Sequence, residues 1–369
     1  MSTVPALSQS LPVFPWDRLK PYDETARAHP DGIVDLSIGT PVDPVPALVR
    51  RALADAADSP GYPTVWGTEA LRDALTGWAE RRLGARGLTH RNVLPVVGSK
   101  ELVAWAPVQL ALGTGDRVGY PRLAYPTYEV GARLAGAGLA PYDDPTLLDP
   151  EGLRLLWLNS PSNPTGRVIP KDELARIVAW AREHGVVVLS DECYLELGWE
   201  GPEPVSVLHP DVCGGSYEGL VAVHSLSKRS NLAGYRAAFL VGDENVLGEL
   251  LQVRKHGGMM VPSPIQAATV AALGDDGHVA EQRERYAARR EPLRAALEAN
   301  GFRVDHSDAG LYLWSTREED CWDTVGHLAE RGILVAPGEF YGEAGARHVR
   351  VALTATDERI GAAVKRLGG

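Results

Sequence analysis

The chain has 369 residues, a length that allows a large buried core and predicts two or three domains. Its formal net charge is −11, and it contains no block of lysine and arginine, so a nucleic-acid partner is not expected. No apolar run is long enough to span a membrane, and the first residues, MSTVPALSQSLPVFPWDRL, lack the basic segment and apolar core of a signal peptide. These properties predict a cytoplasmic globular protein with no membrane partner.

Cysteine and histidine usage argues against a metal site. Cys193, Cys213 and Cys321 lie far apart, and the 10 histidines include neither an HExxH motif nor an i, i+4 pair. We therefore expect reduced cysteines that mainly fill the core, and no bound metal.

Strand and helix signals alternate through the middle of the chain. The apolar run NVLPVVG (92–98) precedes a helical pattern at 99–112. Further on, RLLWLN (154–159) and VVVLSDE (186–192) flank the stretch DELARIVAWAREHG (172–185). Four apolar residues of that stretch recur at helical spacing, namely Leu174, Ile177, Val178 and Ala181. Pro170 before it and Gly185 at its end are typical helix boundaries, so the segment predicts a βαβ unit.

The runs LVAVHS (220–225) and AAFLVG (237–242) continue the strand series, which predicts an α/β fold with a mostly parallel central sheet sandwiched by helices. After about residue 275, a charged helical stretch is followed by short strand-like runs at 311–315, 332–336 and 348–353. We expect a large domain over residues 45–275, and a smaller α+β domain formed by residues 1–44 and 276–369.

The common nucleotide motifs are absent. The glycines of GTGDRVG (113–119) have the wrong spacing for GxGxxG, and GSK (98–100) lacks the residue order of a P-loop.

Polar residues gather directly behind a predicted core strand in HSLSKRSNLAGYR (224–236). A lysine there is partly desolvated, which lowers its pKa and favours the neutral amine that attacks carbonyls, so Lys228 is a Schiff-base candidate. Ser225, Ser227 and Arg236 carry groups that bind phosphate, and Gly234 is expected to make the turn that brings Arg236 back beside the lysine. Taken alone, the stretch favours a solvated loop after a strand.

Two other strands also end in polar residues. NSPSNPTG (159–166) and SDECY (190–194) each follow a predicted strand. Since ligands of open α/β sheets bind beyond the carboxyl ends of the strands, we expect Asn163, Asp191 and Lys228 to converge on one cleft.

At this point the chain resembles a known family. Eight segments in order are similar to the fold-type I pyridoxal 5′-phosphate (PLP) aminotransferases of class I and II, the aspartate aminotransferase superfamily, over nearly the whole chain. The segments are IGTP (38–41), YPTVWG with EALRDAL (62–75), GSKELV (98–103), YPTY (125–128), NSPSNPTG, SDECY, SLSKRSNLAGYR and HVRVAL.

The resemblance implies a role for each matching residue in binding the cofactor. Lys228 forms the Schiff base and moves the proton between the substrate Cα and the cofactor C4′; Asp191 faces the pyridine nitrogen. Asn163 and Tyr194 hydrogen-bond the phenolic oxygen, and Tyr125 stacks on the ring. The implied phosphate ligands are Ser225, Arg236, Ser227, Ser99 and Lys100, the last two through backbone at a helix start.

The resemblance also implies substrate and subunit contacts. Arg350 binds the substrate α-carboxylate, with help from Asn163 and the backbone of Gly39. Tyr62 reaches the phosphate of a neighbouring subunit, which implies a homodimer with shared active sites. Simpler structural interpretations remain open for some residues: a core or turn position for Tyr125 and Tyr62, a turn for Ser227, and a side chain clear of the ligand for Lys100. Cys193 is expected to pack in the core, because strand alternation points it away from Asp191 and Tyr194.

The motif set favours transamination, although PLP enzymes with other reactions share this site. Longer strings, FPWDRL (14–19), HPDGIVDLSIGTPVDPVP (29–46) and 123–136, resemble actinobacterial N-succinyl-LL-diaminopimelate aminotransferases of lysine and diaminopimelate biosynthesis. This implies ping-pong exchange between glutamate/2-oxoglutarate and N-succinyl-2-amino-6-oxopimelate. The alternatives are another class I/II aminotransferase (aspartate, alanine or aromatic) or a PLP C–S β-lyase.

Such a substrate carries carboxylates far from the one at Arg350, and they require a second cationic site. Arg18, Arg254 and Lys255 are the candidates from the sequence, with ordinary surface charge as the alternative interpretation.

Overall fold

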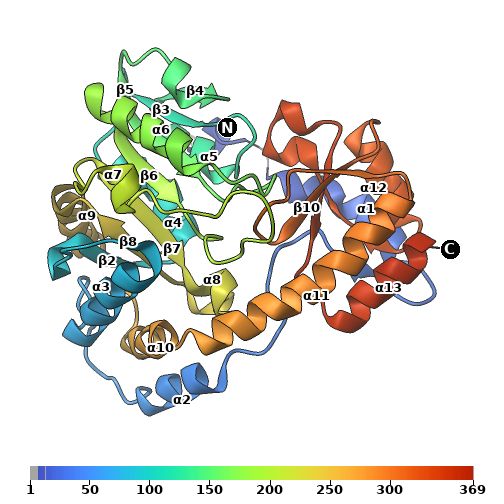
Figure 1. Ribbon diagram of the computed structural model, residues 1–369, viewed down its shortest axis with the longest axis horizontal. Coiled ribbons are helices and arrows are strands. Elements are labelled where there is room, and N and C mark those ends of the chain that lie inside the picture. Colours follow the sequence, from blue (N-terminus) through green and yellow to red (C-terminus); the bar gives the residue numbers. More distant parts are fainter. Residues whose placement is uncertain (1–6, 13, 369) are drawn as a thin grey trace, which may run out of the picture.

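The computed structural model describes residues 7–12 and 14–368. The expected domain range 1–44 therefore includes residues 1–6 and 13 that lie outside the described residues, as does residue 369 of the range 276–369. Figure 1 shows two bodies, one around a large sheet and one around β10, with the long helix α11 running from the first to the second.

The first body is built around the sheet order β2-β8-β7-β6-β5-β3-β4. Its strands are β2 (Val93–Val97), β3 (Arg117–Pro121), β4 (Gly138–Tyr142), β5 (Leu153–Asn159), β6 (Val187–Asp191), β7 (Leu220–Ser225) and β8 (Ala237–Gly242). Its helices are α2 (Ala47–Asp55), α3 (Glu69–Leu83), α4 (Ser99–Gln109), α5 (Thr127–Ala135), α6 (Lys171–Glu183), α7 (Pro210–Cys213), α8 (Leu226–Arg229), α9 (Glu244–Gly257) and α10 (Ser263–Leu273). Only β8 runs antiparallel to its neighbours in this sheet, so the predicted mostly parallel α/β fold is confirmed.

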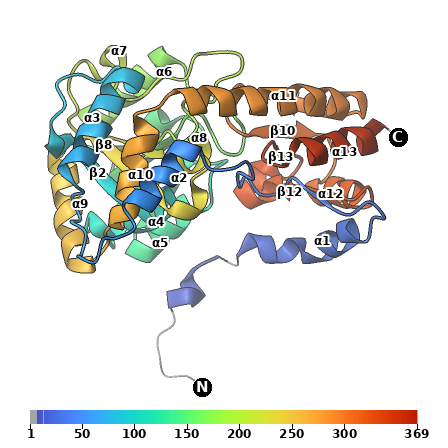
Figure 2. The same cartoon turned by 90° about the horizontal axis from the view of Figure 1, so that it is seen from below.

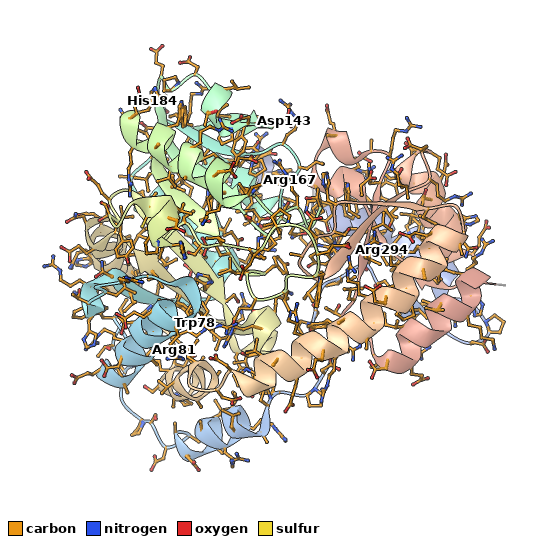
Figure 3. The ribbon with its side chains drawn as sticks, viewed as in Figure 1. Trp78, Arg81, Asp143, Arg167, His184 and Arg294 are labelled. Carbon is orange, nitrogen blue, oxygen red and sulfur yellow. The ribbon has the colours of Figure 1, made fainter. Side chains whose placement is uncertain are left out.

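The central strands are buried on both faces, as expected for a sheet covered by helices. One hydrophobic cluster lies between the sheet and helices that include α3, α6 and α10, and another lies on the opposite face under α4, α5 and α9. Side chains fill the space between ribbon layers (Figure 3), where Trp78 of α3 packs its ring 4.8 Å from His224 and 5.1 Å from Phe239.

The second body contains residues from both ends of the chain. It is made of α1 (Lys20–Arg27), β1 (Val34–Asp35), α11 (Gly277–Ala299), β9 (Arg303–Asp305), β10 (Tyr312–Thr316), α12 (Cys321–Ala329), β11 (Ile333–Leu334), β12 (Ala336–Pro337), β13 (Val349–Ala352) and α13 (Asp357–Gly368). β1 pairs with β11, and α1 lies beside α12 (Figure 2). A separate hydrophobic cluster fills this body, which supports the predicted domain boundaries; those boundaries remain a prediction.

Two strands of the large sheet were not predicted from the sequence. β3 contains Gly119 and ends at Pro121, and β4 carries alternating exposed residues at the edge of the sheet, so neither has a continuous apolar run. In the described part of the chain, no helix is both long and apolar enough to cross a membrane.

Candidate active site

The sheet register brings three polar strand ends together. Asn159 at the end of β5 lies opposite Asp191 at the end of β6, and β7 ends beside them at Ser225. Because these strands are parallel neighbours, the residues that follow them meet at one edge of the sheet. The loop after β5 carries Asn163, and the short helix α8 after β7 carries Lys228.

Lys228 is partly buried at this edge. Its Nζ donates a hydrogen bond to the backbone carbonyl of Gly39, which comes from the N-terminal part of the chain. Burial lowers the pKa of the Lys228 amine, and the nearby cations Arg350 and Arg236 act in the same direction. The amine is therefore more readily deprotonated than that of an exposed lysine, as a nucleophilic lysine requires.

Asp191 is buried and held by two donors. Oδ2 accepts a hydrogen bond from the Tyr128 hydroxyl at 2.9 Å, and Oδ1 accepts one from the backbone N–H of Cys193 at 3.2 Å. Burial raises the pKa of Asp191 although both contacts oppose the rise. Tyr128 in turn stacks on Trp157 of β5 with ring centroids 5.0 Å apart, so the carboxyl group has a fixed orientation.

The expectation that Cys193 points away from Asp191 is wrong, although the residue does pack against the hydrophobic cluster of the second body. Its thiol lies close enough to Asp191 for the carboxylate to act on its pKa. The reason is that β6 ends at Asp191 and the chain then turns, so strand alternation no longer sets the direction of the next side chains. Burial and the neighbouring carboxylate raise the pKa of this thiol well above its usual range.

The other end of the site forms an anion cradle. The helix α4 begins at Ser99, directly after Gly98, whose φ is 86°. A Cβ on Gly98 would collide with the guanidinium of Arg236, so the exposed arginine lies against this helix start. Ser225 donates from Oγ to the Oγ of Ser227 at 2.9 Å. A helix N-terminus, hydroxyl groups and a guanidinium together fit a phosphate group.

One detail of the cradle differs from the sequence interpretation, and a second, at Lys100, is compatible with it. Gly234 does not adopt a left-handed conformation; Arg236 itself does so, with φ 55°, and its Nη1 donates to the carbonyl of Ala233 at 2.7 Å. The side chain of Lys100 is exposed and lies 5.9 Å from the ring centroid of Phe14.

Arg350 of β13 is buried next to the loop after β5. Its Nη1 donates to Asn163 Oδ1 at 3.0 Å, and its Nη2 donates to the carbonyl of Ser37 at 2.7 Å. Nε is buried without a hydrogen-bond partner among the described residues. Because Asn163 accepts this bond with its side-chain oxygen, its amide nitrogen is left to donate to another group.

Two tyrosines that sequence reasoning missed enclose the Arg350 guanidinium. Its central carbon lies 3.9 Å from the ring centroid of Tyr312 and 4.9 Å from that of Tyr341. The hydroxyl of Tyr312 is 3.1 Å from that of Tyr194. The sequence identified 311–315 only as a strand-like run, and because every residue of β10 is buried, its pattern singles out no residue as a neighbour of Arg350.

Tyr125 and Tyr62 lie in very different environments. Burial raises the pKa of the Tyr125 phenol to about 12. Its ring meets that of Tyr128 edge-on, with the centroids 6.0 Å apart, and Tyr128 is the residue that donates to Asp191. Tyr62 is 98% exposed in the single chain, so a core position for it is wrong.

Of the three cations considered for distal carboxylates, Arg254 is excluded. It is fully buried and pairs with Glu101 at 2.9 Å because α9 packs against α4, so it cannot reach a substrate. Arg18 is already paired with Glu339 at 3.2 Å and lies 4.6 Å above the Trp322 ring. Lys255 is exposed on α9.

An amine, a buried carboxyl and an anion cradle at one edge of an α/β sheet define an enzyme that holds a phosphorylated cofactor beside a nucleophilic lysine. The chain belongs to the aminotransferase class I and II family, whose model matches residues 31–367. It is 62% identical over 361 residues to a probable aminotransferase of Mycobacterium tuberculosis, covering 98% of this chain and 86% of that protein.

Two further relatives bear on specificity. The 4-dedimethylamino-4-oxo-anhydrotetracycline transaminase OxyQ of Streptomyces rimosus is 60% identical over 359 residues, with 97% of this chain and 99% of that protein covered. A solved structure of a probable N-succinyldiaminopimelate aminotransferase from Thermus thermophilus superposes with a TM-score of 0.85 at 29% identity, covering 95% of this chain and 98% of that one.

The family uses pyridoxal phosphate, as the sequence predicted, and the residues present fit it. The Arg236 guanidinium occupies the place that a Cβ at Gly98 would take, so a cation lies at the start of α4, and Asp191 and Lys228 follow strands that end at the same edge. When bound, the cofactor supplies an electrophilic carbonyl for amines and a conjugated ring that accepts an electron pair.

Proposed function

We propose that this aminotransferase exchanges amino groups between glutamate and N-succinyl-2-amino-6-oxopimelate, in lysine and diaminopimelate biosynthesis. The observation that supports an α-amino acid substrate is the buried guanidinium of Arg350, which Asn163 and the backbone of Ser37 hold in place and which can bind a carboxylate. The acceptor is supported by the sequence strings described above and by the likeness to the Thermus thermophilus structure.

Each side chain of the site has a proposed task. Lys228, with its lowered pKa, would hold the cofactor through its carbonyl carbon and would move the proton at the substrate Cα. Asp191 would pair with the pyridine nitrogen, and the amide of Asn163 and the hydroxyl of Tyr194 would donate to the phenolic oxygen. Tyr125 would cover the ring. The proposed phosphate ligands are Ser99, Lys100, Ser225, Ser227 and Arg236, and those of the substrate carboxylate are Arg350, Asn163 and Gly39.

The proposed assembly is a cytoplasmic homodimer in which the partner subunit's Tyr62 completes the phosphate site. The support is the 98% exposure of Tyr62, a large aromatic side chain, close before α3. Trp105 and Val108 of α4 and Val253 of α9 are also exposed on adjoining helices, and a second copy would bury them. Sedimentation should give twice the mass of the chain, and Tyr62→Phe should weaken binding of pyridoxal phosphate.

A bulkier ketone acceptor is the second candidate. Aromatic rings lead outward from Arg350: Tyr341 lies 6.5 Å from Trp16, and Trp16 lies 5.2 Å from Phe340 and 5.7 Å from Phe14. Such a wall offers apolar contact to a ring system, and the name of the relative OxyQ gives a polycyclic ketone as its substrate.

A donor and acceptor panel tests both candidates. The holoenzyme is mixed with glutamate, and loss of its visible absorption reports transfer of the amino group; acceptors are then offered, including N-succinyl-2-amino-6-oxopimelate and an aromatic ketone. Preference for the succinylated acceptor supports the first proposal, and preference for the aromatic ketone supports the second. Release of pyruvate and ammonia from cystathionine would instead identify a β-lyase. Lys228→Ala should abolish every one of these reactions.

A further inference from the structure

Tyr312 contacts several groups of the site with one side chain. It begins β10 in the small sheet and is only 4% exposed. One face of its ring lies under the Arg350 guanidinium at 3.9 Å, and its hydroxyl meets that of Tyr194 at 3.1 Å. Tyr194 follows β6 of the large sheet, so the hydroxyl pair joins the two bodies of the protein.

The tip of Tyr312 also reaches the lysine side of the site. A Cβ at Gly39 would collide with the Tyr312 hydroxyl, so only a glycine leaves room for the tyrosine there. The carbonyl of Gly39 accepts the hydrogen bond from Lys228. The Tyr312 hydroxyl is therefore packed between Tyr194 and the segment that holds the lysine amine.

We propose that Tyr312 is a positioning residue for transamination: its hydroxyl orients that of Tyr194 toward the cofactor, and its ring holds the guanidinium of Arg350 for the substrate carboxylate. The proposal rests on the roles of Tyr194, Lys228 and Arg350 given under Proposed function. It does not depend on which acceptor the enzyme uses.

The surroundings act differently on the two hydroxyl groups of the pair. Although burial opposes it, the cations Arg350 and Lys228 lower the pKa of the Tyr312 phenol. Burial raises the pKa of Tyr194 well above its usual range. Either hydroxyl can donate in this pair. In the proposed arrangement Tyr312 donates to Tyr194, so that the proton of Tyr194 stays free to donate elsewhere. Without Tyr312, the Tyr194 hydroxyl can rotate away.

Two substitutions separate the contribution of the Tyr312 ring from that of its hydroxyl. Tyr312→Phe keeps the ring under Arg350 and removes only the hydroxyl, so KM for the amino donor should stay within about threefold of the wild-type value while kcat falls about tenfold. Tyr312→Leu also removes the ring and should raise KM in addition. The variants are compared as holoenzymes with the donor that the wild-type protein uses best.

A double-mutant cycle tests whether Tyr312 acts through Tyr194. In a Tyr194→Phe background, adding Tyr312→Phe should change kcat by less than about twofold, because the group that it orients is already gone. The pH midpoint of the visible absorption band should also move upward in Tyr312→Phe, since a less firmly held donor stabilises the ionised cofactor less. The titratable groups around the pair are Arg350, Lys228, Cys193, Tyr125, Tyr341 and Tyr286.

The matched control is Tyr286→Phe, which removes a buried hydroxyl from α11, where Arg289 lies over the ring. It should leave kcat, KM and the band midpoint unchanged. The proposal is overturned if Tyr312→Phe lowers kcat by less than about twofold, or lowers it equally in both backgrounds, or acts on KM alone. A failure of the proposed function would look different, because then no amino donor would change the visible band of the wild-type enzyme.

Discussion

Arg350 and Asn163 connect the two bodies of this protein through one buried hydrogen bond, 3.0 Å from Nη1 to Oδ1. One residue belongs to β13 of the small sheet and the other to the loop after β5 of the large sheet. The proposed carboxylate ligand and the proposed cofactor ligand therefore fix each other's orientation. A change at either one should alter both substrate binding and the geometry around the lysine.

Arg350→Lys tests the carboxylate site. Lysine keeps the positive charge but loses the planar fork and the contacts with Asn163 and Ser37. We expect KM for the amino donor to rise about 30-fold to 100-fold, which corresponds to a loss of about 2 to 3 kcal/mol of binding. The control is Arg347→Lys. Arg347 is an exposed arginine just before β13, and it pairs with Glu318. Equal effects of the two substitutions would contradict the assignment.

Gly98→Ala tests the anion cradle. The new methyl group would collide with the Arg236 guanidinium, and the φ of 86° is unfavourable for alanine. The backbone strain should cost about 1 kcal/mol of stability, and displacement of Arg236 should weaken pyridoxal phosphate binding by about tenfold or more. Titration of the stripped protein with the cofactor, followed by its absorption, measures this affinity.

Gly136→Ala is the matched control for this change. Gly136 also has a left-handed conformation, with φ 71°, but a Cβ there meets open space. Gly136→Ala should lower the free energy of unfolding by a similar amount and leave the affinity for the cofactor unchanged. If both variants bound the cofactor equally well, the contact between Gly98 and Arg236 would have no part in the site.

The strand ends of the site could be predicted from the sequence because they follow a simple rule. Asp191, Asn163 and Lys228 each come after an apolar run, and neighbouring parallel strands must end at one edge. The order of the eight family segments supplied the remaining roles. The site predictions therefore rest on local patterns and on chain order, and the roles of the residues remain proposals.

The contacts between the two bodies could not be predicted in the same way. Tyr312 belongs to a strand that is buried throughout, and Tyr341 ends a four-residue helical turn, so periodicity gives no sign that they border Arg350. Cys193 was misread because alternation fails once a strand ends, and Gly234 because the left-handed turn is made at Arg236. Each of these features depends on packing between segments that are distant in sequence.

Arg254 illustrates the same limit and leads to a stability prediction. Its charge made it a candidate for substrate binding, but it is buried between α9 and α4 and paired with Glu101. Arg254→Ala should lower the free energy of unfolding by about 3 kcal/mol, because the change leaves Glu101 without its partner. KM should not change in the folded variant. Lys255→Ala, at the exposed neighbouring position, should alter stability by less than about 0.5 kcal/mol.

Asp191 should show opposite effects on stability and on activity. Burial raises its pKa above the value in the unfolded chain, so the folded state binds the proton more tightly. In the protein without cofactor, the free energy of unfolding should therefore fall as the pH rises from the unfolded pKa through the raised folded one. Asp191→Asn cannot ionise, so this fall should disappear and the variant should be more stable at neutral pH.

The same substitution should nearly abolish transamination, because the amide cannot favour a protonated pyridine nitrogen; we expect kcat to fall at least about 100-fold. Denaturant unfolding of the cofactor-free protein between pH 4 and pH 8 checks the expected effect on stability. Measurement of kcat for the holoenzyme checks the expected loss of activity. Asp243→Ala is the comparison, since this carboxylate caps α9 and accepts from the N–H of Gly219 at 2.7 Å. It should lower stability by about 1 kcal/mol and leave kcat intact. A loss of stability in Asp191→Asn at neutral pH would mean that this carboxyl serves the fold instead of the cofactor.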